Sequence, residues 1–150
     1  MDVSHEANPN CVAEENTKDV CLALSPKGDC SDSPHGQIGD WDVSQVRDMS
    51  GLFSEAKAFN GDISKWDVSS VSGMHGMFSD AVAFNRDISK WDVSRVTNMN
   101  GMFQNAKIFN ADISKWDVSS AISMEGMFNG AIKFQQDVST WDVSRVTDMS

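Results

Sequence analysis

The chain has 150 residues, of which 40% are hydrophobic, and its formal net charge is −10. It has no apolar run of about 18 residues, so we expect no membrane span. It also has no basic stripe to neutralise phosphates, so we expect no nucleic-acid partner. Residues 1–40 hold eight acidic and two basic residues, whereas residues 41–140 hold twelve acidic and nine basic ones. The acidity therefore belongs mainly to the N-terminal segment.

Residues 1–36 are predicted to be an acidic, cysteine-containing N-terminal cap. Their start has acids and prolines in place of the basic and apolar parts of a signal peptide, so either the protein is not exported or a leader has been removed. A repeat array needs a polar cap, and a short cap without its own core usually needs a covalent or metal staple. We expect a disulfide here and hence an oxidising compartment, either extracellular or at the cell surface. Free thiols, or zinc held by the three cysteines and His35, are the alternatives. The cysteines are Cys11, Cys21 and Cys30.

Residues 37–150 are built from a repeated unit of 25 residues that reads W-D-V-S-x-V-x-x-M-x-G-M-F-x-x-A-x-x-F-N-x-D-I-S-K. Repeats of this length predict stacked units that share a continuous core, which is a solenoid. The four full units are unit 1 (41–65), unit 2 (66–90), unit 3 (91–115) and unit 4 (116–140), followed by a truncated unit 5 (141–150). The tryptophans that should form a core ladder are Trp41, Trp66, Trp91, Trp116 and Trp141.

Each unit is predicted to hold one short strand and one short helix, which makes the chain an α/β repeat solenoid. In unit 3, Val96, Met99, Met102, Phe103 and Ala106 share one face of a helix, preceded by a serine as N-cap. The segment D-I-S-K-W-D-V has β-branched residues among polar ones, which suits a short extended stretch. We attribute the glycine inside each helix to close approach of the next coil.

The striped apolar and polar positions have structural explanations. Methionine thioethers could hold Cu(I), but they share the apolar face with phenylalanine and alanine, so we expect core packing. The asparagines that follow phenylalanine predict a side-chain ladder that satisfies backbone groups at a turn. Two rows of aspartates, one in D-V-S and one in D-I-S, are expected to accept hydrogen bonds from turn amides. Calcium between coils is the alternative for these rows. No cofactor is expected.

The stretch "FNGDISKWDVSSVSGMHGMF", which begins at Phe59, resembles the repeat of Mycoplasma surface lipoproteins of unknown function. That family is similar to the BspA-like leucine-rich repeats. The resemblance covers about residues 37–150 and implies a right-handed, leucine-rich-repeat-like coil with a role in surface display, adhesion or scaffolding. It implies no catalytic residues.

No catalytic motif is present, and rows of equivalent aspartates do not offer the two different environments that a pair of catalytic carboxylates needs. We therefore expect a non-enzymatic surface or secreted scaffold that binds a protein partner or mediates adhesion. The residues that contact the partner should lie at positions that vary between units. The candidate partner face consists of Arg47, His75, Arg95, Asn100 and Glu125.

Two further expectations concern other surfaces. The invariant Asp, Ser and Lys positions could bind a periodic ligand such as a polysaccharide, ice or a mineral. The open C-terminal edge, where Val143, Val146 and Met149 lack the next coil, predicts self-association or a longer repeat protein.

Overall fold

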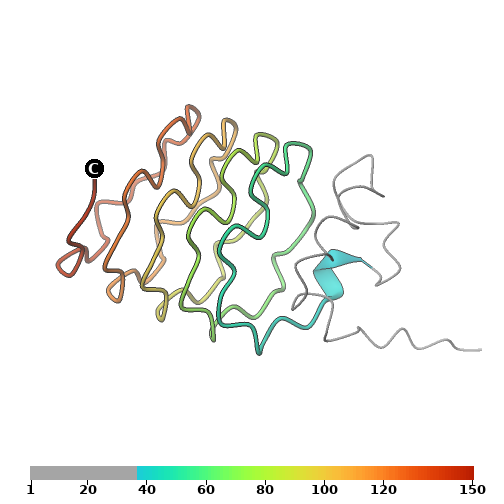
Figure 1. Cartoon of the computed structure of the whole chain (residues 1–150), viewed down its shortest axis with the longest axis horizontal. Coiled ribbons are helices and arrows are strands. Elements are labelled where there is room, and N and C mark those ends of the chain that lie inside the picture. The colour runs from blue at the N-terminus through green and yellow to red at the C-terminus, as the bar shows by residue number, and fades with distance from the viewer. Residues whose placement is uncertain (1–36) are drawn as a thin grey trace, which may run out of the picture.

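The computed structural model describes residues 37–150, and the predicted N-terminal cap with its three cysteines lies outside them. Each 25-residue unit makes one coil, and the coils lie side by side in chain order toward the C-terminus (Figure 1). A 3₁₀ helix, η1 (Ile38–Asp40), precedes unit 1 and is the only helix within residues 37–150. The period of the sequence is therefore also the period of the coils.

Neighbouring coils pair through isolated parallel β-bridges at one equivalent position. The hydrogen bonds flank this position: Ser72 N donates to Arg47 O at 2.8 Å, and Met49 N donates to Gly73 O at 2.9 Å. The expected strand is thus reduced to a single bridged residue in each coil. The bridge residues are Asp48, Gly73, Asn98, Ser123 and Asp148.

The helix expected after each bridge is replaced by consecutive turns. In unit 1, Leu52 N donates to Met49 O at 3.1 Å, but the next amide, Phe53 N, donates to Met77 O of unit 2 at 2.8 Å. Amides thus bond alternately within their own coil and to the next one. An α-helix would keep all these hydrogen bonds inside one coil. In the turns, every second amide instead donates to a carbonyl of the next coil.

Two positions in each turn segment have left-handed backbone, which explains why no helix forms. The first is the repeated glycine, with φ of 65° at Gly51 and 58° at Gly76. The second is held by Glu55 in unit 1 at φ 61°, and by Gly130 in unit 4 at φ 74°. The glycines are thus needed for their backbone conformation. The expectation of a close approach was wrong at Gly51, where an added Cβ would meet no atom within 4 Å.

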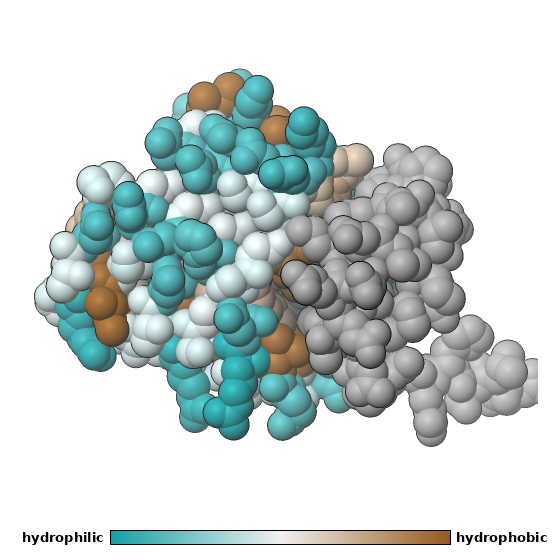
Figure 2. All heavy atoms as spheres, viewed as in Figure 1, coloured by the Kyte–Doolittle hydropathy of each residue, from teal (hydrophilic) through white to brown (hydrophobic). Residues whose placement is uncertain are grey.

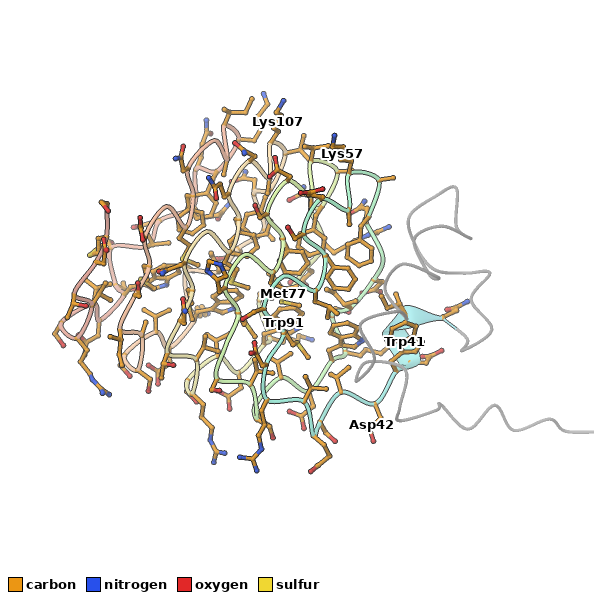
Figure 3. All side chains as sticks on the ribbon, in the orientation of Figure 1. Trp41, Asp42, Lys57, Met77, Trp91 and Lys107 are labelled. Carbon is orange, nitrogen blue, oxygen red and sulfur yellow. The ribbon has the colours of Figure 1, made fainter. Side chains whose placement is uncertain are left out.

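The core consists of ladders of equivalent apolar side chains, as the repeat predicts. Trp66 and Trp91 stack with centroids 6.5 Å apart, and Phe78 and Phe84 stack within one coil at 4.0 Å. Figure 3 shows Trp91 and Met77 inside the stack, while Lys57 and Asp42 lie at its periphery. The indole N–H of each later tryptophan donates to the carbonyl of the isoleucine 28 residues earlier, as Trp91 Nε1 does to Ile63 O at 3.2 Å. The tryptophan ladder therefore has a polar as well as an apolar component.

Equivalent aromatic rings of neighbouring coils have different spacings in different ladders. The centroids are 5.6 Å apart from Phe78 to Phe103 and 6.0 Å apart from Phe84 to Phe109. The tryptophan rings have the largest of these spacings, at 6.5 Å. Pure translation would give one spacing everywhere, so successive coils are also rotated relative to one another.

Candidate interaction surface

Five positions that vary between units lie close to the bridge residues in the sequence. We call this surface the variable face and define it by the five predicted residues. Arg47 immediately precedes a bridge residue, His75 and Glu125 follow one by two positions, and Arg95 precedes one by three. These four side chains are exposed, and Asn100 is half-buried. The structure therefore gathers them along one segment of successive coils.

Charged groups of neighbouring coils influence each other on the variable face. The Asp48 carboxylate accepts a hydrogen bond from Ser50 N at 2.9 Å. Its pKa lies below the ordinary value mainly because of hydrogen bonds from Ser50, and the charge of His75 in the next coil lowers the pKa further. The face thus presents a negative group near His75, with Arg47 in the same coil as Asp48 and Arg95 in unit 3.

Asn100 has a structural role in addition to its place on the variable face. Its own N–H donates to Asn98 Oδ1 at 3.0 Å. Its side-chain oxygen accepts hydrogen bonds from Glu125 N at 2.9 Å and from the Ser123 hydroxyl. Because this oxygen joins units 3 and 4, Asn100 is a poorer candidate for partner binding than the four exposed residues.

At the positions equivalent to Arg47 in later coils, the hydroxyl groups are bonded to the backbone. Ser72 Oγ donates to Arg47 O and Thr97 Oγ1 donates to Ser72 O, each at 3.2 Å. Thr147 repeats the pattern with Ile122 O. In this row Ile122 replaces a hydroxyl residue and is 44% exposed. The row therefore offers apolar and cationic contacts more than free hydroxyl donors.

The invariant face, which we define as the D-I-S-K and D-V-S positions, is built from repeated aspartate turns. Asp67 Oδ1 accepts hydrogen bonds from Ser69 N at 3.0 Å and Ser69 Oγ at 2.6 Å. Asp87 Oδ1 accepts one from Ser89 N at 2.9 Å. These hydrogen bonds lower the pKa of both carboxyl groups, and Lys90 lowers that of Asp87 further. The expected bonding to turn amides is confirmed, and it lies within each coil.

The predicted asparagine ladder runs between coils. Asn85 N donates to Asn60 Oδ1 at 3.1 Å, and Asn110 N donates to Asn85 Oδ1 at 2.8 Å. Gln135 takes the place of asparagine in unit 4, and its N–H still donates to Asn110 Oδ1 at 2.9 Å. In units 2, 3 and 4, the backbone amide at this position therefore donates to the asparagine side chain of the preceding unit. By contrast, the serine expected as an N-cap donates its hydroxyl to aspartate, as in Ser94 to Asp92 at 2.6 Å.

Sequence reasoning missed an exposed corner of the coils. Ile108 is 45% exposed and Ile132 is 72% exposed, next to the exposed Lys107 and Lys133. Figure 2 shows brown apolar atoms at this upper corner among polar ones. The signal in the sequence was weak, because the two positions between alanine and phenylalanine change from unit to unit.

Within residues 37–150, no group of three or more His, Cys, Asp and Glu side chains could hold a metal ion. No helix in this part of the chain is long and apolar enough to cross a membrane.

The chain is a repeat protein whose units stack through backbone bonds and aromatic ladders. It belongs to the family described as "Mycoplasma protein of unknown function, DUF285", whose model matches residues 28–128 and 88–150. No curated protein and no solved structure matches the chain. The family membership agrees with the resemblance to the Mycoplasma repeat.

Proposed function

We propose that this chain is a non-enzymatic repeat scaffold that binds a protein partner through its variable face, at a cell surface or in secreted form. One observation carries the proposal: four exposed side chains at positions that differ between units, Arg47, His75, Arg95 and Glu125, lie close to the bridge residues of successive coils. A right-handed, leucine-rich-repeat-like coil would place them on its concave surface, where repeat proteins commonly bind. The relation to BspA-like leucine-rich repeats is part of this proposal.

The electrostatics of the variable face suit a protein partner with mixed charge. Arg47 and Arg95 offer planar donors that bind carboxylates with two hydrogen bonds, and Glu125 offers an acceptor one coil further. The exposed Ile122, in the same coil as Glu125, adds an apolar contact. Such a pattern changes from coil to coil, so it matches an irregular protein surface better than a uniform polymer.

A matched pair of charge reversals tests this proposal. Purified matrix and cell-surface proteins are immobilised as an array, and binding of the 150-residue chain is compared with that of Arg95→Glu and Lys90→Glu. The two substitutions change the net charge equally, but Lys90 lies on the invariant face. We expect Arg95→Glu to weaken binding at least about tenfold and Lys90→Glu to change it less than about twofold. The opposite order would contradict the proposal.

A second candidate function, binding of a periodic ligand, is favoured by the geometry of the invariant face. Its aspartates are held in the same turn in every coil, with Oδ1 engaged in all of them. Such a row of fixed carboxylates fits a mineral or polysaccharide that repeats along the stack. Thermal-hysteresis and glycan-array measurements test this function, and Asp92→Asn with Asp117→Asn should abolish any signal that arises from it.

A further inference from the structure

We propose that the invariant face carries a groove for an acidic polysaccharide, whose sugar carboxylates bind a row of lysines and whose hydroxyls bind the aspartate between them. The inference rests on the second candidate function, binding of a periodic ligand, and names the class of that ligand. The lysine row consists of Lys65, Lys90 and Lys115, one in each of units 1, 2 and 3.

The ammonium groups of the lysine row are cations without a bound partner. All three side chains are exposed, and none forms a hydrogen bond or an ion pair within residues 37–150. Each lysine precedes a tryptophan of the core ladder, and the ring centroids are 6.5 Å apart both from Trp66 to Trp91 and from Trp91 to Trp116. The lysines therefore recur once per coil beside the tryptophan ladder.

Two polar pockets follow the lysine row and share one of its members. The first, of about 500 Å³, joins units 1 and 2 and is lined by Ser64, Lys65, Asp87 and Lys90. The second, of about 250 Å³, also has Lys65 in its lining, together with Arg86. Because both pockets reach Lys65, they form one groove that crosses successive coils.

Asp87 lies in this groove as a fixed acceptor. Its Oδ1 accepts a hydrogen bond from Ser89 N at 2.9 Å. Hydrogen bonds from Ser89 and the charge of Lys90 hold the pKa of Asp87 below its ordinary value, so the carboxylate stays ionised. A carboxylate has about four acceptor positions, so positions remain for sugar hydroxyls. A ligand that carries hydroxyls between its carboxylates therefore fits this groove better than a chain of closely spaced anions.

Arg86 adds a cation of fixed position to the groove. Its Nε donates to Asn60 O of unit 1 at 2.6 Å. This bond holds the guanidinium group in place and leaves its two terminal nitrogens to bind a carboxylate with two parallel hydrogen bonds. The equivalent residues in the other full units are Gly61, Ala111 and Gln136. Arg86 should therefore anchor the ligand at units 1 and 2.

The ligand must be a polymer, because each single contact on this exposed face is weak. An exposed ion pair contributes little to binding, and salt screens it. Several contacts along one ligand chain reinforce each other through effective concentration. Hexoses linked through opposite sides of the ring repeat at a length close to one coil spacing, about 5 Å. Successive sugars can thus meet successive lysines, and affinity should rise with the length of the ligand.

The test uses the 150-residue chain and hexamers of galacturonate, mannuronate and guluronate, with a chelator present so that calcium cannot bridge carboxylates. Titration calorimetry compares the chain with Lys90→Glu and with Lys107→Glu, whose lysine is exposed but lines neither pocket. The two substitutions change the net charge equally, and circular dichroism checks that both variants fold. We expect at least one hexamer to bind, at least about tenfold more weakly to Lys90→Glu and within about twofold to Lys107→Glu.

Asp87→Asn separates recognition of a sugar from attraction between opposite charges. If Asp87 accepts hydrogen bonds from sugar hydroxyls, the substitution should weaken binding of the hexamer at least about threefold. If Asp87 only repels the anionic ligand, the same substitution should strengthen binding. A neutral hexamer of galactose with the same linkage should not bind, because it lacks the carboxylates.

Three results would each overturn the inference: no binding of any uronate hexamer at about 1 mM, equal losses in Lys90→Glu and Lys107→Glu, or stronger binding in Asp87→Asn. Binding of a mineral or a neutral polysaccharide, with none of the uronates, would overturn the inference but keep the periodic-ligand function. Negative thermal-hysteresis and glycan-array measurements would remove both.

Discussion

Units 2 and 3 share their sequence pattern with unit 4 and unit 5, yet the same positions have different environments. Trp91 is 4% exposed and Phe109 is 0% exposed, whereas their equivalents Trp141 and Phe134 are only half-buried. The residues are identical, so the difference comes from the number of neighbouring coils. Each coil contributes half of a core and receives the other half from the next coil. Stability in this chain should therefore depend on position along the stack.

The largest expected effect comes from removing an aromatic ring in an inner coil. Phe109→Ala should lower the free energy of unfolding by about 3–5 kcal/mol, because it leaves a cavity between stacked rings. Phe134→Ala, the same substitution one coil further on, should cost clearly less, because Phe134 is only half-buried. Urea denaturation followed by tryptophan fluorescence measures both. Equal losses would mean that the two coils are equally packed.

The asparagine ladder should show the same contrast at a smaller scale. Asn85→Ala removes the acceptor of Asn110 N and should cost about 0.5–1.5 kcal/mol. The Gln135 side chain accepts no hydrogen bond from another rung within residues 37–150, so Gln135→Ala should change the stability of this 150-residue chain by less than about 0.5 kcal/mol. Thermal unfolding of the two variants gives the comparison. A larger effect at Gln135 would contradict it.

A third comparison concerns the second left-handed position. Glu55 has φ 61°, and glycine already occupies the equivalent position in unit 4, at Gly130. Glu55→Gly removes a steric conflict and should raise the free energy of unfolding by up to about 1 kcal/mol. Lys57→Gly is the control: its φ is not positive, so added chain freedom should lower stability. Chemical denaturation of both proteins should give shifts of opposite sign.

The smallest effect is a pH dependence carried by the aspartate turns. Hydrogen bonds from serine lower the folded-state pKa of Asp62 and Asp87. A carboxyl whose folded pKa is depressed contributes stability above its unfolded value, about 3.9, and loses it as the pH falls through the folded pKa. The unfolding midpoint should therefore fall as the pH drops from about 5 toward 2.

Substitution identifies the source of that pH dependence. Asp87→Asn keeps an oxygen that can accept from Ser89 N but removes the titration, so the decrease in midpoint on acidification should be smaller than in the original chain. Lys57→Ala is a control outside the turns. An unchanged pH dependence in Asp87→Asn would show that other carboxyl groups cause it.

The sequence predicted the contacts between equivalent residues of different units, but it gave a wrong prediction for the backbone conformation within each unit. The period, the tryptophan and phenylalanine ladders and the asparagine ladder all follow from equivalence at 25 residues. The helix did not follow, because apolar residues at spacings of three and four also fit turns with i to i+3 bonds. The glycine repeated at Gly51 and Gly76 was the available signal, since glycine favours left-handed backbone and is unfavourable inside a helix.

The candidate surface was predicted as a set of residues but not in its geometry. Variation between units located Arg47, His75, Arg95 and Glu125, and all four are exposed. Its place beside the bridges could not be predicted, because that depends on which residues of neighbouring coils pair. The bonding of Asn100 to unit 4 also depends on a neighbouring coil, so one unit's sequence does not reveal it.

The alternation of amide bonds within and between coils has a mechanical consequence. A pull along the stack loads the bonds between one coil and the next, and the end coil has the fewest neighbours to retain it. Coils should therefore detach singly, starting from an end. Each released coil adds about 85 Å of extended chain, at about 3.4 Å for each of its 25 residues, in place of about 5 Å of stack. Under tension, the length of the chain would therefore increase in equal steps, one for each coil that unfolds.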